Sequence, residues 1–405
     1  MNRLIKQWEK NGRFRISVLI VAVTLFAVIL LSSQSRGLQW ENHPSDFGTR
    51  DFVAFWSAFH AVKDGKNPYS MSEIYPFQSH VIKDEVSTQA FLNPPWSLAV
   101  LAPVIALDFA SARFFWIVLN IIFLFVTITL ILNYLHSPGL VGINNFLAAV
   151  LFLPSFWTLW LGQLTVFLTA CFAAAVTAIL KGRGWLAGLL LIPLTLKPHL
   201  FLVVGVVLAV YVLRRKSLPL IVSFITGFLT LQLVTYLFEP KIYTYWLNME
   251  FSPLILKTSS LVTMLRESIM LFSGSLMDWP VVAVPAIGTA LSLPWFLKRL
   301  GECDIELLIP PALCISLGIA PYAWLHDFAL LLVCQATLLV LVARMKPPST
   351  IKMEIIFMLL GLQLAIVITI SITHGLQYVF WVPWAMLTIW VRSLNLLYVE
   401  KIWRV

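Results

Sequence analysis

The sequence alternates between long apolar stretches and short polar or basic intervals over most of its length. Several apolar stretches, such as 218–238, 281–297 and 355–373, approach the roughly 20 residues that a helix needs to cross a bilayer core. A membrane β-barrel would instead show segments of about 10 residues with alternating polarity. The pattern therefore predicts an all-α polytopic membrane protein, with residues 1–405 forming a single integral membrane domain.

Two longer polar intervals interrupt this pattern, at 34–93 and at 239–279. Because Lys and Arg concentrate in cytoplasmic loops, we place the basic N-terminus and the cluster at 214–216 in the cytoplasm. Both polar intervals then lie outside, provided that one earlier apolar stretch does not cross the membrane. The candidates for that stretch are 94–108, which is the shortest, and 143–161. We expect about 12 crossings and a large first extracytoplasmic loop that carries interfacial helices.

The composition agrees with this class of protein. Hydrophobic residues make up 60% of the chain and charged residues 12%, about half the charged fraction of a soluble domain. The net charge of +9 comes from basic clusters between apolar stretches, so we attribute it to membrane topology and not to nucleic-acid binding. The four cysteines lack metal-type spacing, and we expect no metal site, cofactor or disulfide framework. The apolar stretch 16–33 lacks a small-residue cleavage site, which favours an uncleaved first span.

The first loop carries our main candidate for catalysis, Asp51. It precedes aromatic residues at helical spacing, namely Phe52, Phe55, Trp56 and Phe59, which predicts a helix with one apolar face. Such a helix would lie in the interface plane with its aromatic side in the acyl boundary. Asp51 is either an N-terminal helix residue favoured by the helix dipole or a general base for an acceptor hydroxyl. Asp46 is the alternative base.

Two further polar positions interrupt apolar stretches. Lys197 precedes Pro198 between two apolar segments, and a lysine at membrane depth needs a partner or a water-filled cavity. It either extends to the interface or holds the phosphate of a lipid-linked substrate. Gln163, directly after Gly162, either faces the same cavity or forms a hydrogen bond between helices.

The outer intervals contain other candidates. The segment at 322–327 ends in His326 and Asp327, which form either a polar interfacial turn or a site that orients the donor phosphate or the acceptor. In the second outer interval, Arg266 is either a phosphate ligand or the partner of Glu267 in a solvated ion pair.

Several short motifs follow one another along the chain: Asp51, then Gly65-Lys66-Asn67-Pro68-Tyr69, Asn93-Pro94-Pro95, Pro154 with Gly162-Gln163, Ala187-Gly188, Leu196-Lys197-Pro198, and Pro321-Tyr322-Ala323-Trp324-Leu325-His326-Asp327. Their order over about residues 45–345 resembles glycosyltransferase family 87. That family contains polyprenol-phosphate-mannose-dependent mannosyltransferases of the GT-C superfamily.

The resemblance implies a GT-C-type transmembrane bundle and metal-independent, inverting sugar transfer. It implies Asp51 as the catalytic base, with Lys197 and His326 near the donor. To these residues we add Arg266 as a further donor-phosphate ligand. Substrate-binding roles are assigned to five more residues: Gln163, His199, Tyr69, Trp324 and Asp327.

The expected activity is transfer of a hexose, with mannose as the family default, from a polyprenyl-phosphate sugar to a glycolipid or glycan acceptor. The reaction would occur on the extracytoplasmic side of a membrane, and the lack of a large soluble domain suits a bacterial inner membrane. The alternative is a transporter or flippase for lipid-linked sugars, because broken helices and intramembrane charges also mark transport pathways. Transporters commonly contain internal repeats, and the two halves of this sequence show no convincing duplication.

Overall fold

The structure, a computed structural model, describes residues 48–81, 89–134, 152–249 and 258–397. Within these ranges every regular element is a helix and no strand is present. Five of the described helical segments are long and apolar enough to cross a membrane: Phe109–Ile131, Leu218–Phe238, Trp279–Arg299, Leu325–Met345 and Ser349–Thr373. The prediction of a helical membrane protein is confirmed at this level. The predicted total of about 12 crossings and the single domain over 1–405 stay predictions, and the stretch 16–33 and Asp46 lie outside the described residues.

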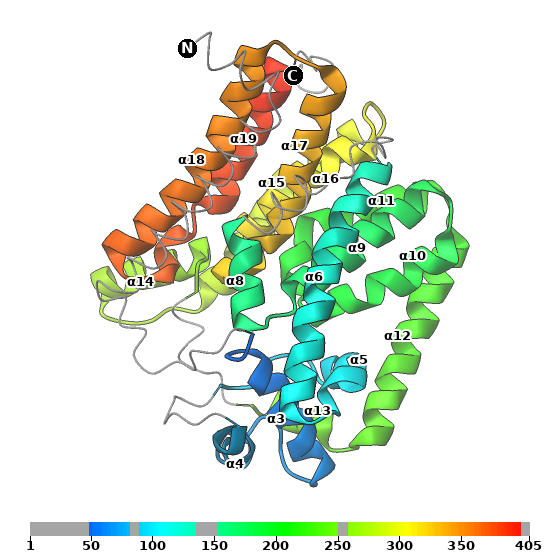
Figure 1. Cartoon of the computed structure of the whole chain (residues 1–405), viewed down its shortest axis with the longest axis vertical. Coiled ribbons are helices and arrows are strands. Elements are labelled where there is room, and N and C mark those ends of the chain that lie inside the picture. The colour runs from blue at the N-terminus through cyan, green and yellow to red at the C-terminus, as the bar shows by residue number, and fades with distance from the viewer. Residues whose placement is uncertain (1–47, 82–88, 135–151, 250–257, 398–405) are drawn as a thin grey trace.

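The described part of the chain is built mainly of α-helices (Figure 1). They are α3 (Phe52–Lys63), α4 (Met71–Val81), α5 (Trp96–Ile105), α6 (Phe109–Tyr134), α8 (Leu153–Leu161), α9 (Thr165–Leu180), α10 (Gly184–Leu191), α11 (Leu202–Arg214), α12 (Leu218–Phe238), α13 (Ile242–Leu247), α14 (Leu261–Ser273), α15 (Trp279–Arg299), α16 (Ile305–Gly318), α17 (Leu332–Met345), α18 (Ser349–Thr373) and α19 (Val382–Leu396). Short 3₁₀ helices complete them: η2 (Ile192–Leu196), η3 (Pro198–Phe201), η5 (Leu325–Leu331) and η6 (Leu376–Val379).

The helices divide into a buried core and an apolar periphery. Helices α9, α16 and α17 are largely buried, whereas α12, α15 and α18 expose many large apolar side chains. An apolar face of this kind suits contact with lipid, because acyl chains solvate it as well as a protein core does. At one end of the molecule, lower in Figure 1, α3, α4 and α5 gather around the ends of the longer helices.

Helix α3 forms where the aromatic spacing predicted it, but its aromatic side packs against other helices and does not face lipid. Ten of its 12 residues are buried, and its aromatic rings pack within the protein. The Phe52 ring stacks on Trp116 with centroids 5.9 Å apart, and Trp56 lies edge-on to Phe109 at 5.4 Å. The predicted orientation toward acyl chains is therefore wrong. The physical reason is that the residues between the aromatics, such as Ala54 and Ala58, are small and apolar, so the helix can be buried on all sides.

Helical structure is interrupted at Gly162 and at Lys197-Pro198, where the sequence analysis separated apolar stretches, and both interruptions shape the site. Gly162 ends α8 with a positive φ of 74°, a conformation that glycine adopts without steric cost. A Cβ atom there would lie 2.5 Å from the Gly48 carbonyl oxygen, so the absence of a side chain lets the first loop approach α8. At the second break, Lys197 has an extended φ of −139° between η2 and η3, as expected for a residue before proline.

Candidate active site

Asp51 is held against the end of α8 by backbone hydrogen bonds. Its N–H donates to the Leu161 carbonyl oxygen at 2.8 Å, and the Gly48 N–H donates to the Trp160 carbonyl oxygen at 2.7 Å. Although Asp51 is the N-cap residue of α3, its side chain makes no capping hydrogen bond. The carboxylate is therefore directed to a partner outside its own helix, and that partner is Gln163.

A continuous network of polar side chains starts at this carboxylate. Gln163 Nε2 donates to Asp51 Oδ2 at 2.8 Å, and Gln163 Oε1 accepts from Lys197 Nζ at 3.3 Å. Lys197 Nζ also forms an ion pair with Asp327 Oδ1 at 2.7 Å. The Gln163 amide has one donor end and one acceptor end, and only this orientation serves the carboxylate and the ammonium together. Residues from the first loop, the α8–α9 turn, the η2–η3 break and η5 thus meet in one place.

The Asp327 carboxylate is the most fully bonded member of the network. In addition to the Lys197 ammonium, it accepts from Thr165 Oγ1 at 3.0 Å and from the Trp324 backbone N–H at 2.9 Å. The side chains of the ion pair are 10% exposed for the lysine and 2% exposed for the aspartate. A buried charge is tolerated when it is paired and its remaining hydrogen-bonding capacity is used. The ion pair therefore anchors η5 to the break between η2 and η3, and the Thr165 hydrogen bond ties η5 to the start of α9.

Lys197 keeps hydrogen-bonding capacity in reserve. An ammonium group has three N–H donors, and within the described part of the chain the Lys197 ammonium uses two, one on Gln163 and one on Asp327. One donor is left to meet an incoming acceptor such as a phosphate oxygen.

Two imidazoles lie near the ion pair, one from buried His326 and one from partly buried His199. His326 Nε2 lies 3.6 Å from Asp327 Oδ1, too far for a good hydrogen bond, and its ring stacks on Trp324 with centroids 6.3 Å apart. The His199 ring lies 3.9 Å from the Tyr322 ring. The Nε2 atoms of both histidines are buried and have no hydrogen-bond partner in the described structure. Buried polar atoms are rarely left unbonded, so both nitrogens are available to a bound ligand.

Three neighbours of the network were not nominated from the sequence. Burial raises the pKa of the Tyr322 phenol to about 12, with Asp327 as the second cause, so the hydroxyl remains a neutral donor. Burial lowers the pKa of the Arg50 guanidinium, and the adjacent Asp51 opposes that effect. The position of Arg50 beside Asp51 was a signal that could have indicated it. No local pattern marks Thr165, because its partner Asp327 is distant in the chain.

The other nominated residues have different surroundings. The Tyr69 hydroxyl donates to the Asn93 carbonyl oxygen at 2.9 Å, which ties the first loop to the start of α5. Arg266 on α14 contacts the Met277 carbonyl oxygen and forms an ion pair with Asp278. The expected partner of Arg266, Glu267, is therefore not the one observed. The described contacts of Tyr69 and Arg266 do not reach the network, and their substrate roles stay predictions.

Exposure differs along the network. Asp51 and Gln163 are partly exposed, whereas Lys197, His326 and Asp327 are buried. The carboxylate of Asp51 is consequently the accessible end, and the cation lies deeper. Within the described residues no group of three or more His, Cys, Asp or Glu side chains is arranged to hold a metal ion.

Apolar helices of membrane-spanning length around a buried ionic network define an integral membrane protein with a polar site at one end of its helices. Residues 91–317 match glycosyltransferase family 87. The match covers more than half of the chain, so the protein belongs to this family, as its motifs predicted, and membership indicates glycosyltransferase activity. Searches of curated proteins and of solved structures found no match.

The matched region contains Gln163 and Lys197 but neither Asp51 nor Asp327. The hydrogen bonds of the network connect these two carboxylates to the matched region from either side. The candidate active site is therefore assembled from family-matched residues and from segments that lie before and after the match.

Proposed function

We propose that the protein transfers a hexose, with mannose as the first donor to test, from a polyprenyl-phosphate sugar to a glycolipid or glycan acceptor. The reaction takes place on the extracytoplasmic side of the membrane, with Asp51 as the general base. The observation that supports this proposal is the hydrogen-bonded chain from Asp51 through Gln163 to the Lys197–Asp327 ion pair. It presents an accessible carboxylate and, deeper, a cation with a donor in reserve.

The two ends of the network match the two needs of the reaction. Asp51 takes the proton of the acceptor hydroxyl, and the acceptor oxygen attacks the anomeric carbon. The bond from that carbon to the phosphate oxygen breaks, and its electron pair leaves with the polyprenyl phosphate. Negative charge therefore grows on the phosphate, where the third N–H of Lys197 can donate, as can His326 in the neutral tautomer that carries its hydrogen on Nε2. Preorganised donors of this kind are a large source of rate enhancement.

A membrane-anchored donor suits the position of the site. A nucleotide sugar is not supplied outside the cytoplasm, whereas a polyprenyl phosphate diffuses within the bilayer and presents its head group at the surface. Exposed apolar surface on α12, α15 and α18 gives the protein extensive contact with the lipid in which such a donor travels.

The replacement Asp51→Asn tests the assignment of the base. We expect transfer from a radiolabelled polyprenyl-phosphate sugar to fall by roughly 10²- to 10⁴-fold, which is the usual contribution of a general base. Asp64→Asn is the matched control, because Asp64 is an exposed carboxylate at the other end of α3. Expression and thermal unfolding should be the same for both variants. Undiminished transfer by Asp51→Asn would exclude this residue from the mechanism.

The assay is performed on purified protein in detergent, with no sealed vesicle and no gradient. Transfer under these conditions supports an enzyme and counts against a flippase. A donor series with mannose, glucose, galactose and arabinose on the same lipid identifies the sugar. Mass spectrometry of cell-envelope glycolipids from a deletion strain identifies the acceptor.

A further inference from the structure

A pocket lies at the opposite ends of the helices that form the candidate active site. Helix α9 is 16 residues long; it begins at Thr165, which contacts Asp327, and ends at the pocket. At 1.5 Å per residue this separation is about 24 Å. Helix α11 likewise leads from the Lys197 break to the pocket. The cavity volume is about 330 Å³, at the lower end of the range for small-molecule sites.

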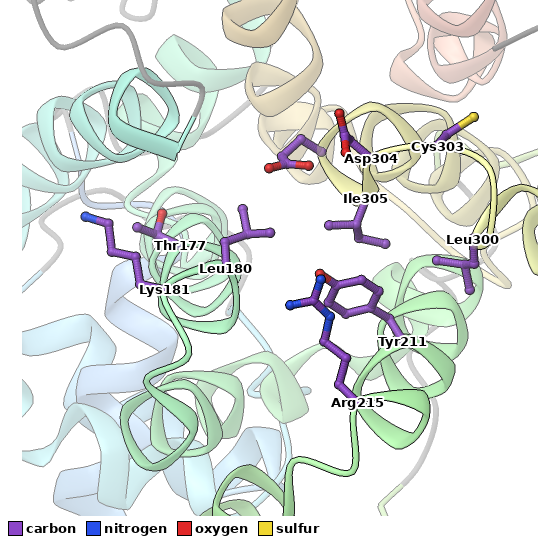
Figure 2. A pocket seen from close by; sticks show the side chains of 10 residues that line it. Thr177, Leu180, Lys181, Tyr211, Arg215, Leu300, Cys303, Asp304 and Ile305 are labelled. Atoms are coloured by element: carbon purple, nitrogen blue, oxygen red, sulfur yellow. The ribbon is translucent and has the colours of Figure 1, made fainter. Parts of the chain in front are cut away.

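Charged side chains of both signs surround this pocket (Figure 2). Lys181 follows α9 and Arg215 follows α11, while Asp304 and Glu306 stand at the start of α16. Figure 2 shows Arg215 and Asp304 on facing sides of the space. Among the described residues none of these four forms an ion pair within 4.0 Å. The Arg215 guanidinium instead lies over the Tyr211 ring, 4.6 Å from its centroid.

Helix dipoles explain each charge separately but not the space between them. Cations favour helix C-termini and carboxylates favour helix N-termini, and the four residues obey that rule. Opposite charges so arranged could pair with each other, yet here a cavity separates them. Apolar side chains complete its wall: Leu180, Leu300 and Ile305. The lining thus offers two anion-binding groups, two cation-binding groups and an apolar surface.

We propose that this pocket binds a zwitterion that carries a phosphate and a primary ammonium, presented by a membrane lipid such as phosphatidylethanolamine. Lys181 and Arg215 meet the phosphate, and Asp304 and Glu306 accept from the ammonium. The carboxylates disfavour a purely anionic head group. They also favour a primary ammonium over choline, because a quaternary nitrogen has no N–H to donate. The pocket lies where apolar helices end, which is the depth expected for lipid head groups.

Lipid retention by the full-length protein tests this proposal. The protein is reconstituted in nanodiscs with equal amounts of phosphatidylethanolamine, phosphatidylglycerol and phosphatidylcholine, and the lipids that remain after extraction are identified by native mass spectrometry. We expect enrichment of phosphatidylethanolamine. Either Lys181→Gln or Arg215→Gln should weaken retention about fivefold, the contribution of one interfacial cation. Asp304→Asn combined with Glu306→Gln should abolish discrimination against phosphatidylglycerol.

Lys298→Gln is the matched control, because Lys298 is an exposed lysine in the last turn of α15 and is not part of the pocket lining. It should leave lipid retention unchanged.

A competition experiment distinguishes a lipid from a soluble ligand of the same chemistry. Soluble glycerophosphoethanolamine is added as the competitor. If it displaces the bound lipid at the lipid's own concentration, the site is assigned to a soluble zwitterion, and if it does not, the site is assigned to the lipid. Equal retention of the three lipids, or an equal loss in Lys298→Gln, would overturn the proposal. Neither result depends on the transferase reaction.

Discussion

Replacing either member of the Lys197–Asp327 ion pair leaves a charge buried without its partner. At 2.7 Å and an effective dielectric constant of about 20, the Coulomb attraction is at most about 6 kcal/mol. Desolvation of the two side chains offsets much of it, because they are only 10% and 2% exposed. When one partner is removed, the desolvation cost of the remaining buried charge is no longer offset by an ion pair, which typically destabilises a protein by about 3–5 kcal/mol. We expect Lys197→Met and Asp327→Asn each to lose stability in this range.

The double variant distinguishes an interacting pair from two independent residues. Met and Asn are close in size to the residues they replace, and the amide introduced by Asp327→Asn still offers an oxygen to the Trp324 N–H that the native carboxylate binds. With both charges absent, the double variant should recover a large part of the loss, giving a coupling free energy of roughly 2–3 kcal/mol. The assay is reversible unfolding in mixed detergent micelles, followed by tryptophan fluorescence. Losses that simply add in the double variant would refute the inferred coupling.

Two further variants test the geometry of the site. Gly162→Ala should lower the free energy of unfolding by more than about 2 kcal/mol, because the residue has a positive φ and its Cβ would lie 2.5 Å from the Gly48 carbonyl oxygen. Gly205→Ala is the control and should not destabilise the protein, because a Cβ atom at Gly205 would meet open space. Gln163→Met should reduce transfer about 10- to 100-fold by removing a hydrogen bond to a charged group. Gln163→Glu keeps the acceptor for the lysine but loses the donor to Asp51, and near-normal transfer by it would contradict a positioning role for that donor.

Much of the fold and part of the site followed from local features of the chain. Apolar length predicted the helical membrane class, aromatic spacing predicted a helix after Asp51, and Gly162 and Pro198 predicted the breaks that the structure contains. These features are local because backbone geometry and the length of a membrane span depend on neighbouring residues. The candidate site residues were also chosen from a local feature, namely charged and amide side chains beside apolar stretches.

Which side chains meet was decided only by tertiary packing. Sequence spacing could not show that Gln163 joins Asp51 to Lys197, or that Asp327 pairs with that lysine, because the partners come from separate segments. Arg266 is instructive in another way. Consecutive helical residues point in different directions, so Glu267 could not face it, and Asp278 does.

The sequence by itself determined the class of protein, the order of its helices and the identity of its unusual polar residues. Tertiary structure decided the burial of α3 inside the protein, where the sequence had favoured the membrane interface, and it decided the partners of every charge discussed above. The physical reason is the same in each case. Helix formation depends on nearby residues, whereas burial and pairing depend on surfaces that become neighbours only when the chain is packed.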